Sequence, residues 1–224
     1  MPRDPHRDAP ILSGGAPLAE AGGALILLHG RAGSAQEMLA LARDLQAGTA
    51  QRFAWFVPEA AGRLWYPFSL LEKVERNRPH LNSALALVKR ILERITAGGV
   101  PPERVALLGF SHGAAVALEF AARNARRYGA LVALSGALLG PEGTPRDYEG
   151  SLAGTPVFLG CGDADPHLPR RRVDETATVL ERLGATVTKR VYAGLGHAMN
   201  ALEIAAALRP LYGECGSTPV EPGS

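Results

Sequence analysis

Short, mostly apolar runs alternate with longer segments of helical period along this chain, and that alternation constrains the fold more than any other feature. The apolar runs lie at 24–29, 53–58, 105–110, 130–135 and 155–160, and a more alternating run lies at 186–193. Helical spacing is found at 34–46, 81–95, 114–126, 173–183 and 201–212. Continuous apolar runs are typical of strands buried on both faces. The pattern therefore predicts an α/β fold, with a mostly parallel sheet covered by helices on both faces.

The length of 224 residues suits one domain of this class. Residues 1–20 carry several charges and prolines and are predicted to form a flexible arm. Residues 21–212 are predicted to form a single α/β domain, and residues 213–224 a flexible tail. No large cap domain fits into this length, so we expect any site at the sheet edge to be open and shallow.

Composition excludes several classes of protein. The formal net charge is +2 and the basic residues are scattered, so we expect no nucleic-acid binding. No uninterrupted apolar stretch approaches the roughly 18 residues of a membrane span, and the N-terminus lacks the apolar core of a signal peptide. The two cysteines, Cys161 and Cys215, are too few for a disulfide framework and do not form a metal-type pair. We therefore predict a cytoplasmic protein without metal or stable membrane insertion, with a Cys161–Cys215 bridge as the alternative.

A serine between two glycines marks the turn after the run at 105–110. In a parallel sheet, ligands bind outside the carboxyl ends of the strands, so the turns after strands are the places to search for chemistry. Gly109, Ser111 and Gly113 form the pattern G-x-S-x-G between a predicted strand and a predicted helix. Such a sharp turn strains the serine backbone and lifts its side chain above the sheet. We predict Ser111 to be a nucleophile, against the alternative of a serine that only caps the helix.

A nucleophilic serine needs a base, and the base needs an orienting carboxylate. Asp163 and Asp165 follow the run at 155–160, and His197 follows the run at 186–193. These residues stand in post-strand loops in the order serine, aspartate, histidine that this architecture requires. His197 is the predicted base. Spacing alone does not decide between the two aspartates.

The other histidines are assigned other roles. His6 and His80 are expected at the surface, and His29 is expected to bond loop backbone. His112 adjoins the nucleophile, but at a helix start its side chain should point away from the hydroxyl, so we expect a neutral imidazole lining the pocket. His167 is a candidate substrate contact.

Four segments together carry a specific resemblance. "LLHGRAGSA", "GFSHGA", "CGDADPHLP" and "YAGLGHAMN" occur in this order, and the chain from about 22 to 212 resembles the phospholipase/carboxylesterase family of α/β-hydrolases. That family includes acyl-protein thioesterases and small bacterial carboxylesterases. The resemblance implies Asp165 as the third member of a Ser111–His197–Asp165 triad, with Asp163 stabilising the turn. It also implies an oxyanion hole formed by the backbone N–H groups of Arg31 and His112. The family often has glutamine where this chain has His112.

The substrate side is less sharply marked. An aromatic loop at 60–70 contains Trp65 and Tyr66, which we predict to wall the substrate pocket; the alternative is that the rings pack the loop onto the body. The irregular stretch at 138–154, rich in glycine and proline, is expected to form another rim.

The sequence thus predicts a serine carboxylesterase that hydrolyses short- to medium-chain esters without any cofactor. The alternative in the same class is an acyl-protein or acyl thioesterase, or a lysophospholipase. A non-catalytic ligand sensor on a hydrolase fold is the alternative from another class, and a lyase is more distant. The expected partner is a small-molecule ester or thioester. The oligomeric state stays open, a homodimer included.

Overall fold

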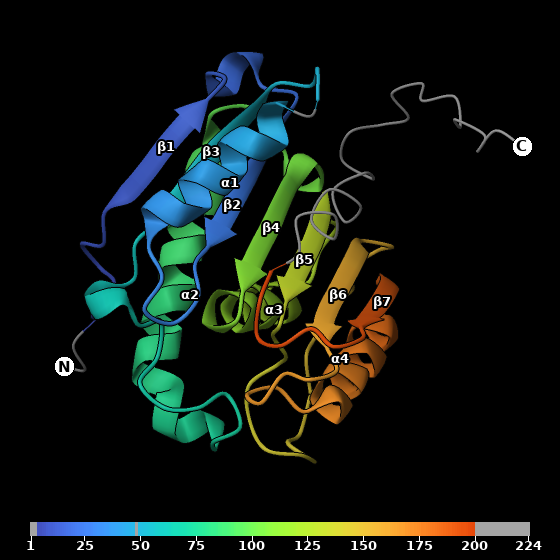
Figure 1. Ribbon diagram of the computed structural model, residues 1–224. Helices are drawn as coiled ribbons and strands as arrows, with labels where there is room; N and C mark the ends of the chain where they lie inside the picture. Colours follow the sequence, from blue (N-terminus) through green and yellow to red (C-terminus); the bar gives the residue numbers. More distant parts are fainter. Residues whose placement is uncertain (1–3, 48, 200–224) are drawn as a thin grey trace, which may run out of the picture.

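The computed structural model describes residues 4–47 and 49–199, and within them seven strands form one sheet (Figure 1). The strands are β1 (Ile11–Gly15), β2 (Gly23–Leu28), β3 (Phe53–Pro58), β4 (Val105–Phe110), β5 (Ala130–Leu134), β6 (Pro156–Gly162) and β7 (Thr186–Tyr192). The helices are α1 (Ala35–Ala47), α2 (Val74–Ala97), α3 (His112–Arg123) and α4 (Arg170–Arg182). Short 3-10 turns lie at Leu18–Glu20, Ala61–Arg63 and Pro102–Arg104.

The strand order across the sheet is β1-β3-β2-β4-β5-β6-β7. Strands β2 to β7 pair in parallel, and β1 alone pairs antiparallel, with β3. All the carboxyl ends of the parallel strands therefore lie at one edge, and the loop after β7 returns along that edge toward β4 (Figure 1). The predicted α/β class is confirmed, because three of the parallel strands, β2, β3 and β5, are buried along their whole length.

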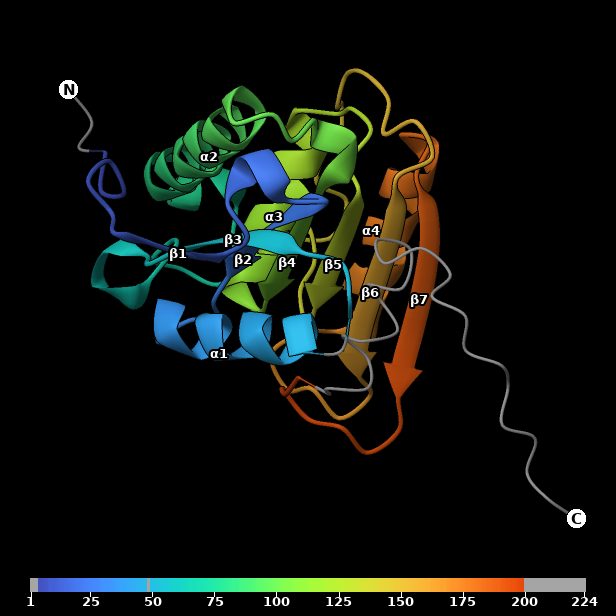
Figure 2. The same ribbon diagram turned by 90° about the horizontal axis from the view of Figure 1, so that it is seen from above.

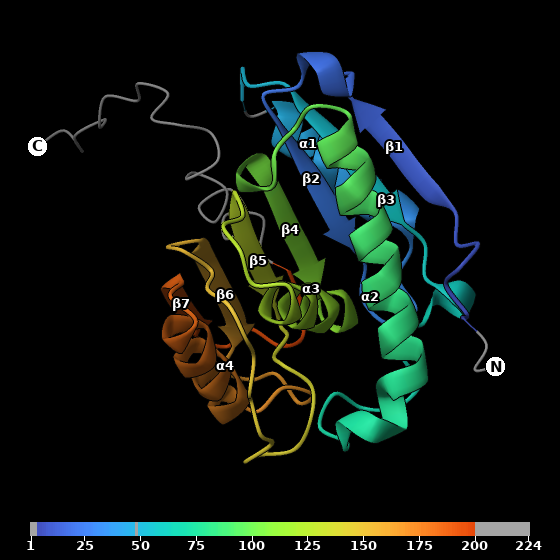
Figure 3. The ribbon, with the colours of Figure 1, turned by 180° about the vertical axis from the view of Figure 1, so that it is seen from behind.

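Helices cover both faces of the sheet. Helix α1 lies on one face, and α2, α3 and α4 lie on the other (Figures 2 and 3). Along β2, Leu25 and Leu27 pack in the core on the α1 side together with Met38, whereas Ile26 and Leu28 pack in the larger core on the opposite side. This period of two divides one apolar strand between two cores. In the described part of the chain, no helix is both long enough and apolar enough to span a membrane.

Helix α2 begins at Val74, well before the predicted start at 81. The buried Asn77 side chain explains the difference, because it accepts a hydrogen bond from Phe68 N–H and donates one to the Ser69 carbonyl. Pro79 lies in the second turn of the helix, and because an interior proline is typical of a helix break, the sequence pattern gave no sign of the turns before it. The predicted helix at 201–212 and the predicted tail at 213–224 lie outside the described residues.

The expectation of a flexible arm over residues 1–20 is wrong from residue 4 onward. Residues 11–15 form β1, whose backbone pairs with all but one residue of β3. His6, expected at the surface, is fully buried: its Nδ1 accepts from Ala61 N–H, and its Nε2–H donates to the Trp65 carbonyl. The partners come from distant loops, so the local charge and proline content gave no sign of this packing.

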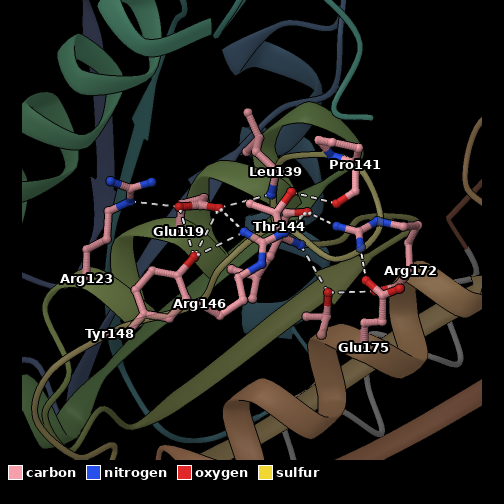
Figure 4. Close-up of polar contacts among 11 residues, drawn as sticks. Glu119, Arg123, Leu139, Pro141, Thr144, Arg146, Tyr148, Arg172 and Glu175 are labelled. Atoms are coloured by element: carbon pink, nitrogen blue, oxygen red, sulfur yellow. Dashed lines mark hydrogen bonds and ion pairs between the residues drawn. The ribbon is translucent and has the colours of Figure 1, made fainter. Parts of the chain in front are cut away.

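The irregular stretch at 138–154, which we call the excursion, is anchored by a buried carboxylate on α3. Glu119 has a side chain with 0% exposure and accepts from Leu139 N–H at 2.9 Å. Figure 4 shows its oxygens between Arg123, at 2.7 Å, and Arg146, at 3.4 Å, with the Tyr148 hydroxyl at 3.3 Å. Two elements of the excursion, around 139 and around 146–148, thus converge on one side chain.

Helix α4 holds the same excursion from the other side. Arg172 Nη2 donates to the Leu138 carbonyl at 3.0 Å, and the guanidinium also pairs with Glu175 (Figure 4). Gly140 N–H donates to the Leu70 carbonyl at 2.7 Å. The excursion is therefore fastened to α3, to α4 and to the loop before α2.

We expect Glu119→Ala to lower the free energy of unfolding by about 3–5 kcal/mol, because it leaves Arg146 largely buried without its carboxylate. Urea denaturation followed by circular dichroism measures the change. The control is Glu93→Ala, which removes a surface pair with Lys89 in which both side chains are 63% exposed. Its expected cost is below about 1 kcal/mol. Equal effects of the two substitutions would contradict a structural role for Glu119.

Candidate active site

The turn between β4 and α3 carries Ser111 in a strained conformation. Its φ of 52° and ψ of −113° lie outside the regions that L-residues prefer. Ser111 N–H donates to the Leu134 carbonyl at 2.8 Å, which fixes the turn to β5. A Cβ atom on Gly109 would lie 2.4 Å from Ala114 N, and one on Gly113 would lie 2.1 Å from the Leu28 carbonyl oxygen. Both glycines are therefore steric requirements of the turn, as predicted.

Ser111, His197 and Asp165 form a continuous chain of hydrogen bonds. The Ser111 hydroxyl lies 2.8 Å from His197 Nε2, and His197 Nδ1 lies 2.7 Å from Asp165 Oδ2. Because the carboxylate can only accept, Nδ1 carries the ring proton and Nε2 is free to accept the proton of the serine. The Asp165 side chain is fully buried, and its Oδ1 accepts from His167 N–H at 2.8 Å and from Leu168 N–H at 3.2 Å. Those donors fix the orientation of the carboxylate.

Asp163, the neighbouring aspartate, bonds the backbone at the end of β7 and in the loop after it rather than the His197 side chain. Asp163 Oδ1 accepts from Gly194 N–H at 2.7 Å, and Asp163 N–H donates to the Tyr192 carbonyl. Ala164 N–H donates to the Leu195 carbonyl at 3.1 Å. The loop after β6 is thus tied to the loop after β7, and this connection brings His197 over the carboxyl ends of the strands.

The loop after β2 runs beside Ser111. A Cβ atom on Gly30 would lie 3.5 Å from the Ser111 Cβ. In the described part of the chain the Arg31 N–H donates to no acceptor. His112 is the first residue of α3, so its N–H has no intrahelical acceptor either. Free N–H groups beside a nucleophile suit a developing oxyanion.

His29 fixes the shape of that loop, as the sequence predicts. Its Nε2 accepts from Ala60 N–H at 3.0 Å, and its Nδ1–H donates to the Gly30 carbonyl at 2.7 Å. Its own carbonyl accepts from Trp65 Nε1–H at 2.8 Å. One buried histidine therefore connects the loop after β2 with the loop after β3.

A cavity of about 510 Å³ opens over Ser111. The described residues that line it are Arg31, Ala32, Ser69, Leu70, Phe110, Ser111, His112, His167, Leu168 and His197. His167, a candidate contact from the sequence, is among them, and its ring meets the His197 ring edge-on at 5.1 Å. Phe110 was missed, because its position at the end of an apolar strand indicated a core residue; its ring lies 5.1 Å from His197.

The predicted pocket wall is wrong. Trp65 and Tyr66 are fully buried and do not line the cavity. Trp65 bonds the His29 carbonyl, and Tyr66 stacks on His112 with ring centroids 4.0 Å apart and planes 10° apart. The aromatic pair supports the site from behind, as in the alternative in which the rings pack the loop onto the body. No described residue of the stretch 138–154 lines the cavity, although Gly140 bonds the backbone of Leu70.

A second cavity, of about 420 Å³, lies between the excursion and α4. Arg146 and Arg172 line it, but both are already paired, with Glu119 and Glu175. No member of the Ser111 hydrogen-bond chain is among its lining residues. The chemistry therefore belongs to the first cavity.

Comparison with known proteins agrees with this arrangement. The sequence profile of the family described as Phospholipase/Carboxylesterase matches residues 15–212. The chain belongs to that family. A crystal structure of a phospholipase/carboxylesterase from Dyadobacter fermentans is 39% identical and superposes with a TM-score of 0.83, covering 88% of this chain and 93% of the other. The fold is thus that of the α/β-hydrolases.

Two curated relatives of this phospholipase/carboxylesterase chain are named Acyl-protein thioesterase 1. The relative from Debaryomyces hansenii is 32% identical over 127 residues, which span 56% of this chain and 55% of the relative. The relative from Saccharomyces cerevisiae is 36% identical over 89 residues, which span 40% and 39%. The matches thus cover about half the length of these relatives or less.

The side chain of His112 is held as a neutral ring. It lines the cavity on one side and stacks on Tyr66 on the other. Burial, and then the positive charge of the Arg31 guanidinium, lower the pKa of His112 to about 3. In the described part of the chain its Nδ1 has no hydrogen-bond partner. Burial also raises the pKa of the Tyr66 hydroxyl, so the stacked pair carries no charge.

This lowered pKa has a consequence for acid stability. Below the pKa that an unfolded histidine has, the unfolded chain binds a proton that folded His112 does not, so stability falls as the pH falls. In the wild type, His112 should lower the free energy of unfolding by about 2 kcal/mol between about pH 7.5 and about pH 5. We expect His112→Gln to abolish this part of the acid loss, because glutamine does not titrate. Urea denaturation of both proteins at both pH values measures it. An equal acid loss in the variant would show that His112 accepts a proton in the folded protein.

Proposed function

We propose that this chain is a serine carboxylesterase that acts through an acyl-enzyme intermediate. The observation that carries the proposal is the unbroken hydrogen-bond chain from Asp165 through His197 to Ser111 at the floor of an open cavity. Membership of the phospholipase/carboxylesterase family supports it. The proposed reaction needs no metal or organic cofactor, because each proton transfer has a side chain in place.

The proposed reaction begins when the Ser111 oxygen attacks the ester carbonyl while His197 Nε2 accepts the hydroxyl proton. Asp165, buried and held by two backbone N–H groups, stabilises the imidazolium that forms. The N–H groups of Arg31 and His112 bind the tetrahedral oxyanion. Collapse of the intermediate breaks the bond to the alcohol, which leaves with the proton from His197. Water then attacks the acyl-enzyme with His197 as base and releases the acid.

The cavity favours substrates of limited length. Leu70, Phe110 and Leu168 provide an apolar lining, and the space of about 510 Å³ is of the size that small ligands occupy. We propose short- to medium-chain esters as the substrates and the cytoplasm as the compartment. The names of the two yeast relatives favour a second candidate, hydrolysis of acyl thioesters. Matched esters and thioesters of increasing acyl length decide between the two by their kcat/KM values.

We expect Ser111→Ala to keep the fold and to lose at least about a thousandfold in kcat/KM for p-nitrophenyl butyrate. The fold is checked by the urea midpoint, and the nucleophile by labelling with a fluorophosphonate probe, which should modify the wild type and spare the variant. Near-normal turnover by the variant would refute the proposed function. Failure of the probe on wild-type protein would favour a ligand sensor.

The two aspartates give a matched pair of variants. Asp165→Asn should lower kcat about 10³- to 10⁴-fold, because the amide favours the wrong tautomer of His197. Asp163→Asn should lower it less than about tenfold, because the amide oxygen can still accept from Gly194 N–H. Steady-state kinetics on the same ester measures both. Equal losses would exclude the assigned division of roles.

A further inference from the structure

The side chain of Arg31 has no role in the reaction proposed above, which uses only its backbone N–H. Arg31 is among the described residues that line the cavity, and it is exposed. Its Nη1 donates to the Pro67 carbonyl at 3.3 Å, a long bond that leaves most of its five N–H donors open. In residues 4–47 and 49–199 it forms no ion pair with a carboxylate.

The cavity lacks an acidic counterpart for this charge. None of its described lining residues is an aspartate or a glutamate. The nearest carboxylate of the proposed machinery, Asp165, is fully buried behind His197 and already accepts three hydrogen bonds. A cation beside a cavity without acid attracts anionic ligands and repels cationic ones.

The field of Arg31 extends to the floor of the cavity. Burial dominates the pKa values of His112 and Tyr66, and in each case the charge of Arg31 lowers the pKa further or opposes the rise. The charge of Arg31 therefore lies near enough to the rings of His112 and Tyr66 to act on both. In the proposed mechanism the backbone N–H of Arg31 binds the oxygen of the substrate carbonyl. An anion bound by the guanidinium of the same residue would lie the length of one arginine side chain away from that carbonyl.

We propose that Arg31 is a specificity-determining residue that selects esters carrying a carboxylate close to the scissile bond. The proposal rests on the proposed esterase function and names its substrate class. A guanidinium presents a planar pair of N–H donors that matches a carboxylate in two parallel hydrogen bonds. The rest of the substrate would lie on Leu70, Phe110 and Leu168.

A purely structural role is the rival explanation, and the chain supplies a control for it. Arg31 links the loop after β2 to the segment 61–70 through one carbonyl, that of Pro67. Arg63 makes a similar link in the reverse direction, because its Nε donates to the Gly33 carbonyl at 2.9 Å. Arg63 is exposed and is not among the described residues that line the cavity. Arg63→Gln therefore removes a loop tether without removing a cation from the site.

The test compares esters that differ in one terminal charge. Monomethyl glutarate is paired with methyl hexanoate, which places the charge in the acyl part, and γ-acetoxybutyrate is paired with pentyl acetate, which places it in the alcohol part. We expect the wild type to prefer the charged ester of at least one pair. In Arg31→Gln the ratio of kcat/KM values, charged over neutral, should fall about 10- to 100-fold. Arg31→Lys should keep part of the preference, and Arg63→Gln should keep all of it.

Salt provides a second readout. The wild-type preference should shrink at about 1 M sodium chloride, because the guanidinium is exposed and its attraction is screened. A ratio that is the same in the wild type and Arg31→Gln, or that falls equally in Arg63→Gln, would overturn the assignment. If neutral esters are hydrolysed and Ser111 is labelled by a fluorophosphonate, such a result leaves the esterase function standing. Failure of labelling and of all turnover would instead refute the esterase function.

Discussion

The close contact between α3 and the strands beneath it is the constraint on which the site depends. Gly113 leaves no room for a side chain against the Leu28 carbonyl, so the first turn of the helix touches the backbone of β2. Gly109 brings β4 equally close to that turn. The residue between them must then adopt a positive φ, and Ser111 does so with its hydroxyl above the sheet. The strain is held by hydrogen bonds on both sides, from Ser111 N–H to Leu134 and from Ala115 N–H to Ser111.

The other loops are positioned against this fixed point by buried polar groups as well as by apolar packing. Asp163 links the loop after β6 to the loop after β7, which carries His197. His29 links the loop after β2 to the loop after β3, and Trp65 closes the connection. The N-terminal segment reaches the same place, since His6 bonds both Ala61 N–H and the Trp65 carbonyl. Apolar side chains such as Tyr66, Leu70 and Leu168 anchor these loops in the core, and directed hydrogen bonds add the precision that catalysis requires.

Much of the fold and of the site could be predicted from the sequence because strands β2 to β6 are buried on both faces along most of their length. Their apolar runs end where the sheet ends, so the residues after them fall at one edge, and Ser111 and Asp165 lie there. His197 lies at the same edge, after the more exposed and alternating β7. Strand β1 escaped detection because "ILSGG" has no pattern of its own, and its pairing is set by β3. The direction of Trp65 and Tyr66 could not be predicted either. It depends on the His29 carbonyl and on the His112 ring, which lie far away in the sequence.

The distribution of charge around Ser111 separates two tasks. The negative charge of Asp165 is buried beneath His197 and saturated with hydrogen bonds, so it acts on the imidazole and is shielded from the ligand. Arg31 lines the cavity and in the described part of the chain is bound only to the Pro67 carbonyl, so its positive charge is available to the ligand that we propose. His112 lines the same cavity as Arg31, and its low pKa keeps it neutral, so it adds no charge beside Arg31. Relative to the glutamine that the family resemblance implies at this position, His112 therefore adds an aromatic surface without adding a charge.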